Sequence, residues 1–299
     1  MRIIVLGGTG FLGRHAAERL RALPGAQVLA AGRSPRADLP LDLARADAGR
    51  LASALREAAP HAVVNCAGAV GGSAVGLTGV NALGPAVLCA ALAEGAPEAR
   101  LVHLGSAAEY GPGDRARTET DPAAPLGLYG AAKLAGTLAV TGSGLDAAVL
   151  RVFNPVGPGA PAASLPGRLA RLLRDAPPDG RVRVGDLSAH RDFVDARDVA
   201  DAVALAVTAP GPLPPVLNIG SGTARPVRAV AEGLIAAAGF RGRLDEDGDG
   251  SPRSAAVPWQ EADVSLARKA LGWNPRRPLA ESLTDLWAET LGLPGERVR

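Results

Sequence analysis

The sequence predicts an α/β protein: a doubly wound parallel sheet of the Rossmann type with a smaller C-terminal lobe. Three observations predict this class. Short runs rich in β-branched residues alternate with longer Ala- and Leu-rich stretches in the first half of the chain. A glycine-rich turn directly follows the first apolar run. After residue 153 the alternation loosens and Pro and Gly become frequent, which indicates a second substructure.

Five buried strands are expected where the β-branched runs are bounded by turn residues. In chain order they are "RIIVLG", "AQVLAAG", "HAVVNCAG", "RLVHLGS" and "DAAVLRVF". The intervening stretches have the length and apolar spacing of helices: "FLGRHAAERLRAL", "AGRLASALREAA", "NALGPAVLCAALAEG" and "YGAAKLAGTLAV". Because strands and helices alternate, the strands should be parallel, with helices on both faces of the sheet.

The second half of the chain is expected to leave the sheet and return to it. The stretch "NPVGPGAPAASLPG" and a short helix after it begin the lobe, whereas "RDVADAVALAV" and "PPVLNIG" return to the sheet as a helix and a strand. Further helices are expected near residues 227–238, 265–271 and 279–291. We therefore assign the dinucleotide-binding domain to residues 1–152 and 192–222, and the lobe to residues 153–191 and 223–299.

Composition narrows the class of protein. The chain has 299 residues, is 47% hydrophobic and carries a formal net charge of +2, so a globular protein without a nucleic-acid partner is expected. Cys66 and Cys89 lie in apolar segments, which suits a reducing compartment. The N-terminus does not resemble a signal peptide, and the apolar stretch "DVADAVALAV" is about half the length of a membrane span. A cytoplasmic protein with no membrane partner is expected.

No metal site is expected. "DEDGDG" places acids at the first, third and fifth positions of a calcium loop, but Ala256 stands where the twelfth position requires Glu. We interpret the surrounding "RLDEDGDGSPR" as a surface loop. The four histidines show no spacing typical of metal ligands.

The glycine turn is a candidate phosphate site. Gly7, Gly10 and Gly13 follow the first expected strand and open the first expected helix. Glycines let the backbone approach a pyrophosphate, and the helix N-terminus supplies amide donors. The plain alternative is a tight turn. The expected cofactor-binding residues here are Gly7, Thr9, Gly10, Phe11, Leu12 and Gly13.

Arg33 favours NADP(H) as cofactor, although NAD(H) remains possible. It ends the second strand, about twenty residues past Gly13, where an NAD site offers a carboxylate and an NADP site an Arg. The alternative is an exposed loop arginine. Asp42 either accepts a hydrogen bond from the adenine amine or caps the following helix.

Ser106, Tyr129 and Lys133 are the candidate catalytic residues. Ser106 ends the fourth strand, and Tyr129 and Lys133 are four residues apart, which places them on one helix face. A nearby ammonium stabilises a phenolate and so makes Tyr useful in acid–base catalysis. Together the three groups could protonate an alkoxide as hydride arrives, or deprotonate an alcohol as hydride leaves.

Taken together, these motifs resemble the extended short-chain dehydrogenases/reductases of the NAD-dependent epimerase/dehydratase family. The resemblance runs from the glycine turn through "NCAG", "VNALG", "GSAAEYG", "YGAAK", "RVFNPVGPG", "HRDFVDARDVADAV" and "LNIGSG" to "ARKALGW". It implies a Rossmann domain, a lobe that holds a nucleotide-linked sugar, and Ser106, Tyr129 and Lys133 as catalytic residues. It also implies a homodimer through helices near 81–94 and 127–140. The further cofactor-binding residues expected are Leu43, Cys66, Ala67, Gly68, Asn81, Tyr129, Lys133 and Phe153.

Within the family, the chain most resembles the GDP-4-keto-6-deoxymannose reductases. Dehydratases carry Asp and Glu where Ala107 and Ala108 stand here, so a dehydratase is not expected. The resemblance implies that Arg191 and Arg253 hold phosphate, a role that suits the bidentate guanidinium. The expected substrate-binding residues are Ser106, Ala107, Ala108, Asn154, Arg191 and Arg253.

The chain also departs from the reductase pattern, which has polar residues at 107 and 108, His at Pro155 and Gln at Ala160. The substrate could therefore be a different keto-sugar or a less polar molecule. Our interpretation is an NAD(P)H-dependent ketoreductase acting on a nucleotide-linked 4-keto-6-deoxy sugar. The alternatives are a nucleotide-sugar epimerase that retains NAD, and an NADP-sensing binding protein.

Overall fold

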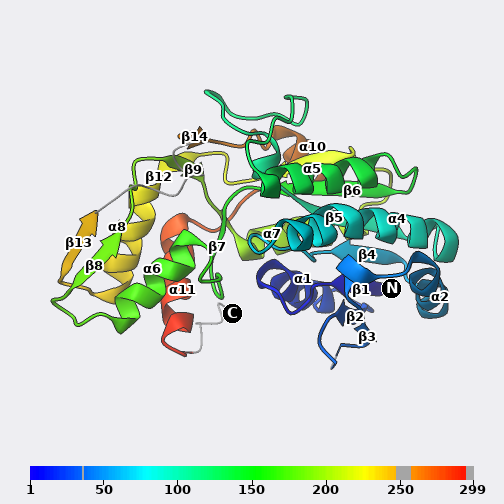
Figure 1. Ribbon diagram of the computed structural model, residues 1–299, viewed down its shortest axis with the longest axis horizontal. Coiled ribbons are helices and arrows are strands. Elements are labelled where there is room, and N and C mark those ends of the chain that lie inside the picture. Colours follow the sequence, from blue (N-terminus) through cyan, green and yellow to red (C-terminus); the bar gives the residue numbers. More distant parts are fainter. Residues whose placement is uncertain (36, 247–256, 294–299) are drawn as a thin grey trace.

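Seven parallel strands form the main sheet, in the order β11-β6-β5-β4-β1-β2-β3. The computed structural model describes residues 1–35, 37–246 and 257–293 (Figure 1). The strands are β1 Arg2–Leu6, β2 Gln27–Gly32, β3 Leu39–Pro40, β4 Ala62–Asn65, β5 Arg100–Ser106, β6 Ala147–Val152 and β11 Val216–Ile219. The α/β class and the six expected strands of this sheet are confirmed. The two-residue β3 was not predicted, because it is too short to show a period.

Helices cover both faces of the sheet. They are α1 Phe11–Arg21, α2 Ala48–Ala58, α4 Gly84–Gly95, α5 Leu128–Thr141 and α7 Ala196–Thr208. Successive side chains of a strand point to opposite faces. In β1, Ile3 and Val5 join the core beneath α1 and α7, whereas Ile4 and Leu6 join the core beneath α2 and α4. The continuous apolar run at the N-terminus thus marks a strand buried on both faces.

The helix before β5 is longer than expected. A short helix, α3 Ala74–Thr78, and a π-helical turn, η2 Gly79–Leu83, precede α4 without a break. Among the described residues, only this stretch, Ala74–Gly95, is long and apolar enough to span a membrane. From the sequence, only "DVADAVALAV" was considered for this property, and the longer stretch Ala74–Gly95 was not anticipated. Because 44% of its apolar window is buried inside the protein, and core helices meet the same criterion, the finding is weak evidence for a membrane.

The lobe lies at one end of the molecule, where α6, α8 and α11 pack together (Figure 1). Their bounds are α6 Leu165–Asp175, α8 Val227–Ala238 and α11 Leu279–Thr290. The lobe also contains short strands that the sequence did not predict, because two to four residues carry too little pattern. They are β7 Pro155–Val156 with β10 Val194–Asp195, β8 Arg181–Val184 with β13 Arg243–Glu246, and β9 His190–Asp192 with β12 Ala224–Pro226 and β14 Trp259–Gln260.

Strand β13 and the packing of the helix at 265–271 in the C-terminal half differ from what the sequence predicted. The expected surface loop "RLDEDGDGSPR" begins as strand β13, because Leu244 packs on the lobe core beside the buried Val182 of β8. The rest of that loop lies outside the described residues. Helix α10, Ser265–Leu271, was expected, but Ala267 and the neighbouring Trp273 pack into the core of the main sheet. The assigned domain boundaries stay a prediction.

Candidate functional site

The glycine turn has the geometry of a phosphate cradle. Gly7 adopts a φ of +72°, and a Cβ there would lie 2.9 Å from the backbone nitrogen of Ala67. A Cβ on Gly13 would run into the Gly7 carbonyl, so α1 can pack on the turn only with glycine at this position. Gly10 caps α1, and its N–H donates to the Gly7 carbonyl at 2.9 Å. The backbone is therefore bare at a helix N-terminus, which fits a dinucleotide pyrophosphate.

The residues around the turn differ in where their side chains point. Thr9 and Gly10 are exposed, and Leu12 packs on the core of the main sheet. Phe11 instead packs on the core of the lobe and lies edge-on to His15 at 5.8 Å. The start of α1 thus reaches both substructures.

The loop after β4 borders the turn and is fixed by two asparagines. Asn65 accepts the Ala67 N–H at 3.0 Å. The amide of Asn81 accepts the Ala69 N–H at 3.2 Å and donates to the Ala69 carbonyl at 2.8 Å. A Cβ on Gly68 would lie 3.1 Å from the Asn81 Oδ1. Asn81 therefore orders the loop that begins at Cys66.

Burial raises the pKa of the Cys66 thiol to about 12. The thiol is therefore neutral near pH 7.

At the adenosine end of the expected site, the structure gives Asp42 a local partner. The Asp42 carboxylate accepts the Ala44 N–H at 3.1 Å and caps the short 3₁₀ helix Leu43–Arg45. This is one of the two alternatives raised for Asp42. The Leu43 side chain is buried in the core beneath α2. Arg33 is exposed just beyond β2, and it makes no ion pair within the described residues.

Ser106 lies at the carboxyl end of β5 and opens the 3₁₀ turn η3, Ala107–Glu109. Its Oγ accepts the Ala108 N–H at 3.2 Å, which leaves the hydroxyl proton for another acceptor. A Cβ on Gly130 would clash with the Ala108 carbonyl, so α5 packs closely on this turn. Since Tyr129 directly precedes Gly130 in the first turn of α5, that packing places the Tyr129 backbone beside the η3 turn that follows Ser106.

Lys133 lies one turn further along α5 and is almost fully buried. Its ammonium donates to the carbonyl of Leu104, two residues before Ser106. Burial lowers the pKa of Lys133, and the nearby Glu109 carboxylate opposes that effect. The Lys133 ammonium thus lies at the carboxyl end of β5, the strand that ends in Ser106, and Tyr129 is one turn before Lys133 on the same helix.

The expected substrate-binding residues continue from this edge toward the lobe. Asn154 follows β6 with a φ of +22°, a conformation that non-glycine residues rarely adopt. Its Nδ2 donates to the Asp192 carbonyl at 2.9 Å and to Gln260 Oε1 at 3.3 Å. Gln260 in turn donates to the carbonyl of Ala107 at 3.0 Å. The buried amide of Gln260 thus links the η3 turn to the lobe.

The other expected substrate and cofactor residues lie in different surroundings. Ala107 is buried and Ala108 half-buried. Arg191 is buried in β9 and donates to the His190 carbonyl at 2.8 Å. Phe153 is fully buried, with its ring 6.2 Å from that of Tyr110, so its side chain belongs to the core. Arg253 and the calcium-like positions 247–256 lie outside the described residues. In the part of the chain that is described, no cluster of potential metal ligands occurs.

Two buried acids near the site were not predicted from the sequence. Asp192 accepts from the N–H and hydroxyl of Ser221 and from the N–H of Gly222, which joins β9 to the loop after β11. Nevertheless, burial raises the pKa of Asp192. The second acid, Glu109, is the last residue of the η3 turn. Its signal was the spacing S-x-x-E over 106–109, which is that of a capping box.

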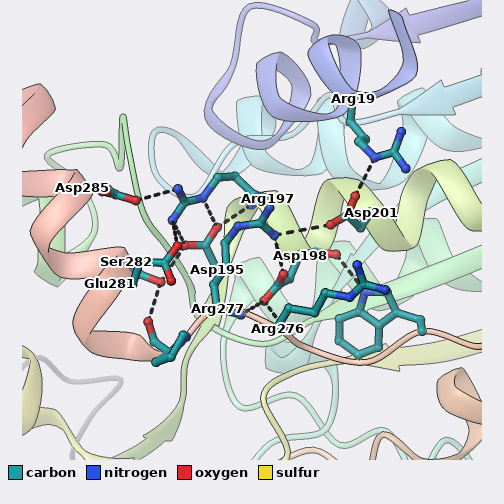
Figure 2. A network of polar contacts seen from close by, with 12 residues as sticks. Arg19, Asp195, Arg197, Asp198, Asp201, Arg276, Arg277, Glu281, Ser282 and Asp285 are labelled. Carbon is teal, nitrogen blue, oxygen red and sulfur yellow. Dashed lines mark hydrogen bonds and ion pairs between the residues drawn. The ribbon is translucent and has the colours of Figure 1, made fainter. Parts of the chain in front are cut away.

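A charged network joins α7 of the main sheet to the lobe (Figure 2). Arg197 on α7 pairs with Asp195 at 2.8 Å and with Asp285 of α11 at 2.6 Å. Ser282 of α11 donates to Asp195 at 2.6 Å. The orientation of the lobe relative to the cofactor domain is therefore set by charge pairs as well as by apolar packing.

Comparisons with known proteins agree with this geometry. The sequence profile of the NAD dependent epimerase/dehydratase family matches residues 3–220. A curated relative from Kitasatospora kifunensis, a dTDP-6-deoxy-L-talose 4-dehydrogenase (NAD(P)(+)), is 39% identical over 96% of this chain and 94% of its own. This relative does not carry the name of the group that the sequence was expected to resemble most, the GDP-4-keto-6-deoxymannose reductases.

Solved structures show the same architecture. MoeE5 in complex with UDP-glucuronic acid and NAD is 28% identical, with a TM-score of 0.82 over 98% of this chain and 99% of MoeE5. The UDP-glucose 4-epimerase of Thermus thermophilus, in complex with NAD, is 25% identical, with a TM-score of 0.83 over 98% of this chain and 99% of the epimerase.

Proposed function

Because this chain belongs to the NAD-dependent epimerase/dehydratase family, and is therefore an NAD(P)-dependent enzyme of the extended short-chain dehydrogenase/reductase type, we propose that it reduces a nucleotide-linked 4-keto-6-deoxy sugar. The observation that carries this proposal is the buried Lys133 ammonium on the helix face of Tyr129, beside the strand that ends in Ser106. The name of the Kitasatospora relative points to redox chemistry at C4 of a dTDP-linked 6-deoxy sugar, which supports the same substrate class.

The proposed mechanism assigns one task to each residue. The glycine turn would hold a nicotinamide dinucleotide, whose chemistry when bound would be hydride transfer to or from C4. Ser106 donates a hydrogen bond to the keto oxygen, and Tyr129 gives that oxygen its proton. Lys133 holds the ribose hydroxyls and stabilises the Tyr129 phenolate that remains. Arg191 and Arg253 are proposed to hold the diphosphate of the sugar nucleotide.

The decisive experiment supplies NADPH and a panel of dTDP- and GDP-linked 4-keto-6-deoxyhexoses, and follows absorbance of the reduced nicotinamide. We expect one of them to be reduced with stoichiometric loss of NADPH. A purified protein that retains NAD and interconverts two sugar nucleotides without net absorbance change would instead be an epimerase. An epimerase is the second candidate function, because a relative and a similar solved structure are both named as epimerases.

We also propose that the cofactor is NADPH, and that Arg33 selects it. A charged hydrogen bond to the 2′-phosphate is worth about 1.5–3 kcal/mol, and exposure of Arg33 reduces this toward the low end. Arg33→Ala should weaken NADPH binding about tenfold and leave NADH binding almost unchanged. Fluorescence titration with both cofactors at one ionic strength measures this. Equal weakening of both cofactors, or a wild type that prefers NADH, would identify NAD as the cofactor.

A homodimer is the proposed assembly, and exposed leucines on the outer helices support it. Leu83 ends η2, Leu128 begins α5 and Leu138 is 62% exposed on α5. Helices η2 and α5 contact each other, and exposed apolar side chains on such neighbouring helices are typical of interfaces. Leu138→Asp should shift the protein from dimer to monomer in sedimentation velocity, whereas the control Leu205→Asp on α7 should not. A monomeric wild type would contradict the proposal.

A further inference from the structure

One buried carboxylate touches both elements that carry the proposed catalytic residues. Glu109 is fully buried at the end of the turn that begins after Ser106. Its Oε1 accepts the N–H of Ser106 at 2.7 Å. Its Oε2 accepts the hydroxyl of Thr137 at 2.9 Å and the Nε of Arg151 at 2.8 Å. The donors lie on three elements: the end of β5, helix α5 and strand β6.

The surrounding residues are suited to this carboxylate. A Cβ on Gly105 would lie 2.9 Å from Glu109 Oε1, so a glycine is needed for the side chain to fold back onto β5. Thr137 is buried and lies four residues after Lys133, on the same face of α5. Glu109 therefore connects the backbone of Ser106 to the face of the helix that carries Lys133.

The Glu109 carboxylate interacts electrostatically with two cationic groups, Arg151 and Lys133. Arg151 neutralises it directly and stacks on the ring of Tyr110, 4.6 Å from its centroid. Burial lowers the pKa of Lys133, and among the described residues the groups that act on it are Glu109 and Cys66. Cys66 is a neutral thiol near pH 7, because its pKa is about 12. The buried His103 on β5 is neutral as well, since burial holds its pKa well below the usual value.

We propose that Glu109 is a positioning residue that holds the Ser106 backbone against the Lys133 face of α5 and keeps Lys133 in its ammonium form. The proposal rests on the proposed function, because that function gives Ser106 and Lys133 their roles. Its test is nevertheless separate, since the charge of Lys133 can be measured without cofactor or substrate.

The titration of Lys133 can be followed individually, because Lys133 and Lys269 are the only lysines of the chain. In protein labelled with ¹³C-lysine, both side chains give signals that follow their titration, and Lys269→Arg assigns them. Glu109→Gln keeps the volume and removes the charge, so the Lys133 titration midpoint should move to lower pH, while Lys269 serves as an unchanged internal reference. Glu119→Gln is the matched control. It removes a different carboxylate, which is half-buried and accepts the Asn218 N–H at 2.8 Å; the groups that act on Lys133 do not include it.

Two further variants keep the proposal testable if Glu109→Gln does not fold, since it leaves Arg151 buried without its partner. Glu109→Gln/Arg151→Leu removes both charges, and the Lys133 midpoint should still fall. Thr137→Val keeps all charges and cuts only the bond between α5 and Glu109; it should lower kcat about tenfold with the Lys133 midpoint unchanged.

An unchanged Lys133 midpoint in the folded Glu109 variants overturns the electrostatic role. Wild-type kcat in Thr137→Val overturns the positioning role. A wild type that turns over no keto-sugar contradicts the proposed function, and the lysine titration still decides the role of Glu109.

Discussion

Replacing Tyr129 by Phe is expected to lower turnover about 10²–10⁴-fold and to leave cofactor affinity nearly unchanged. The substitution removes only the phenolic hydroxyl, which is the proposed proton donor, and keeps the aromatic ring. Lys133 stays in place, because its ammonium is fixed by the Leu104 carbonyl. Steady-state rates with the keto-sugar, together with NADPH titration of the same preparation, measure the two effects separately.

Tyr110 is the matched control, because it is the only other tyrosine of the chain. Its buried hydroxyl donates to Asn218 Oδ1 at 2.8 Å. Tyr110→Phe should therefore cost about 1 kcal/mol of stability and leave turnover near that of the wild type. If Tyr129→Phe keeps turnover within a few-fold of wild type, Tyr129 is not the proton donor and the mechanism is wrong.

What the sequence could predict follows from the range of the signals it carries. The strands of the main sheet are easy to predict because they are buried on both faces, so they are uninterrupted apolar runs. In β1 the buried residues are Ile3, Ile4, Val5 and Leu6. The glycine turn and the Tyr129–Lys133 spacing are equally local. All of these features depend on residues within one element or one turn.

The features that the sequence did not reveal depend on partners far away in the chain. Strand β9 pairs with β12 and β14, whose residues lie more than thirty positions away, and each strand is too short to show a period. Glu109 gains its role from Thr137 and Arg151, and Asn154 gains its partner from Gln260. Side chains that act across such distances have no signature in sequence spacing, apart from the S-x-x-E pattern at Ser106.

The second large expected effect is on stability, and it concerns Asp198 in the charged network between the main sheet and the lobe. Asp198 on α7 has a side chain only 1% exposed, and it accepts three hydrogen bonds from the segment that leads into α11 (Figure 2). The donors are the N–H of Arg276 at 2.9 Å, the N–H of Arg277 at 3.0 Å and the guanidinium of Arg277 at 2.6 Å. Asp198→Ala leaves all three without this acceptor.

We expect Asp198→Ala to lower the free energy of unfolding by about 3–5 kcal/mol, because it removes one partner of a largely buried ion pair. At about 2–4 °C per kcal/mol for a chain of this size class, Tm should fall by about 10 °C in calorimetry. Asp201→Ala is the control on the same helix. Asp201 is 26% exposed; it pairs with Arg19 at 2.6 Å and more distantly with Arg277 at 3.4 Å, so its loss should cost about 1 kcal/mol or less. Equal Tm values for the two variants would mean that the buried bonds of Asp198 do not hold the segment before α11 in place.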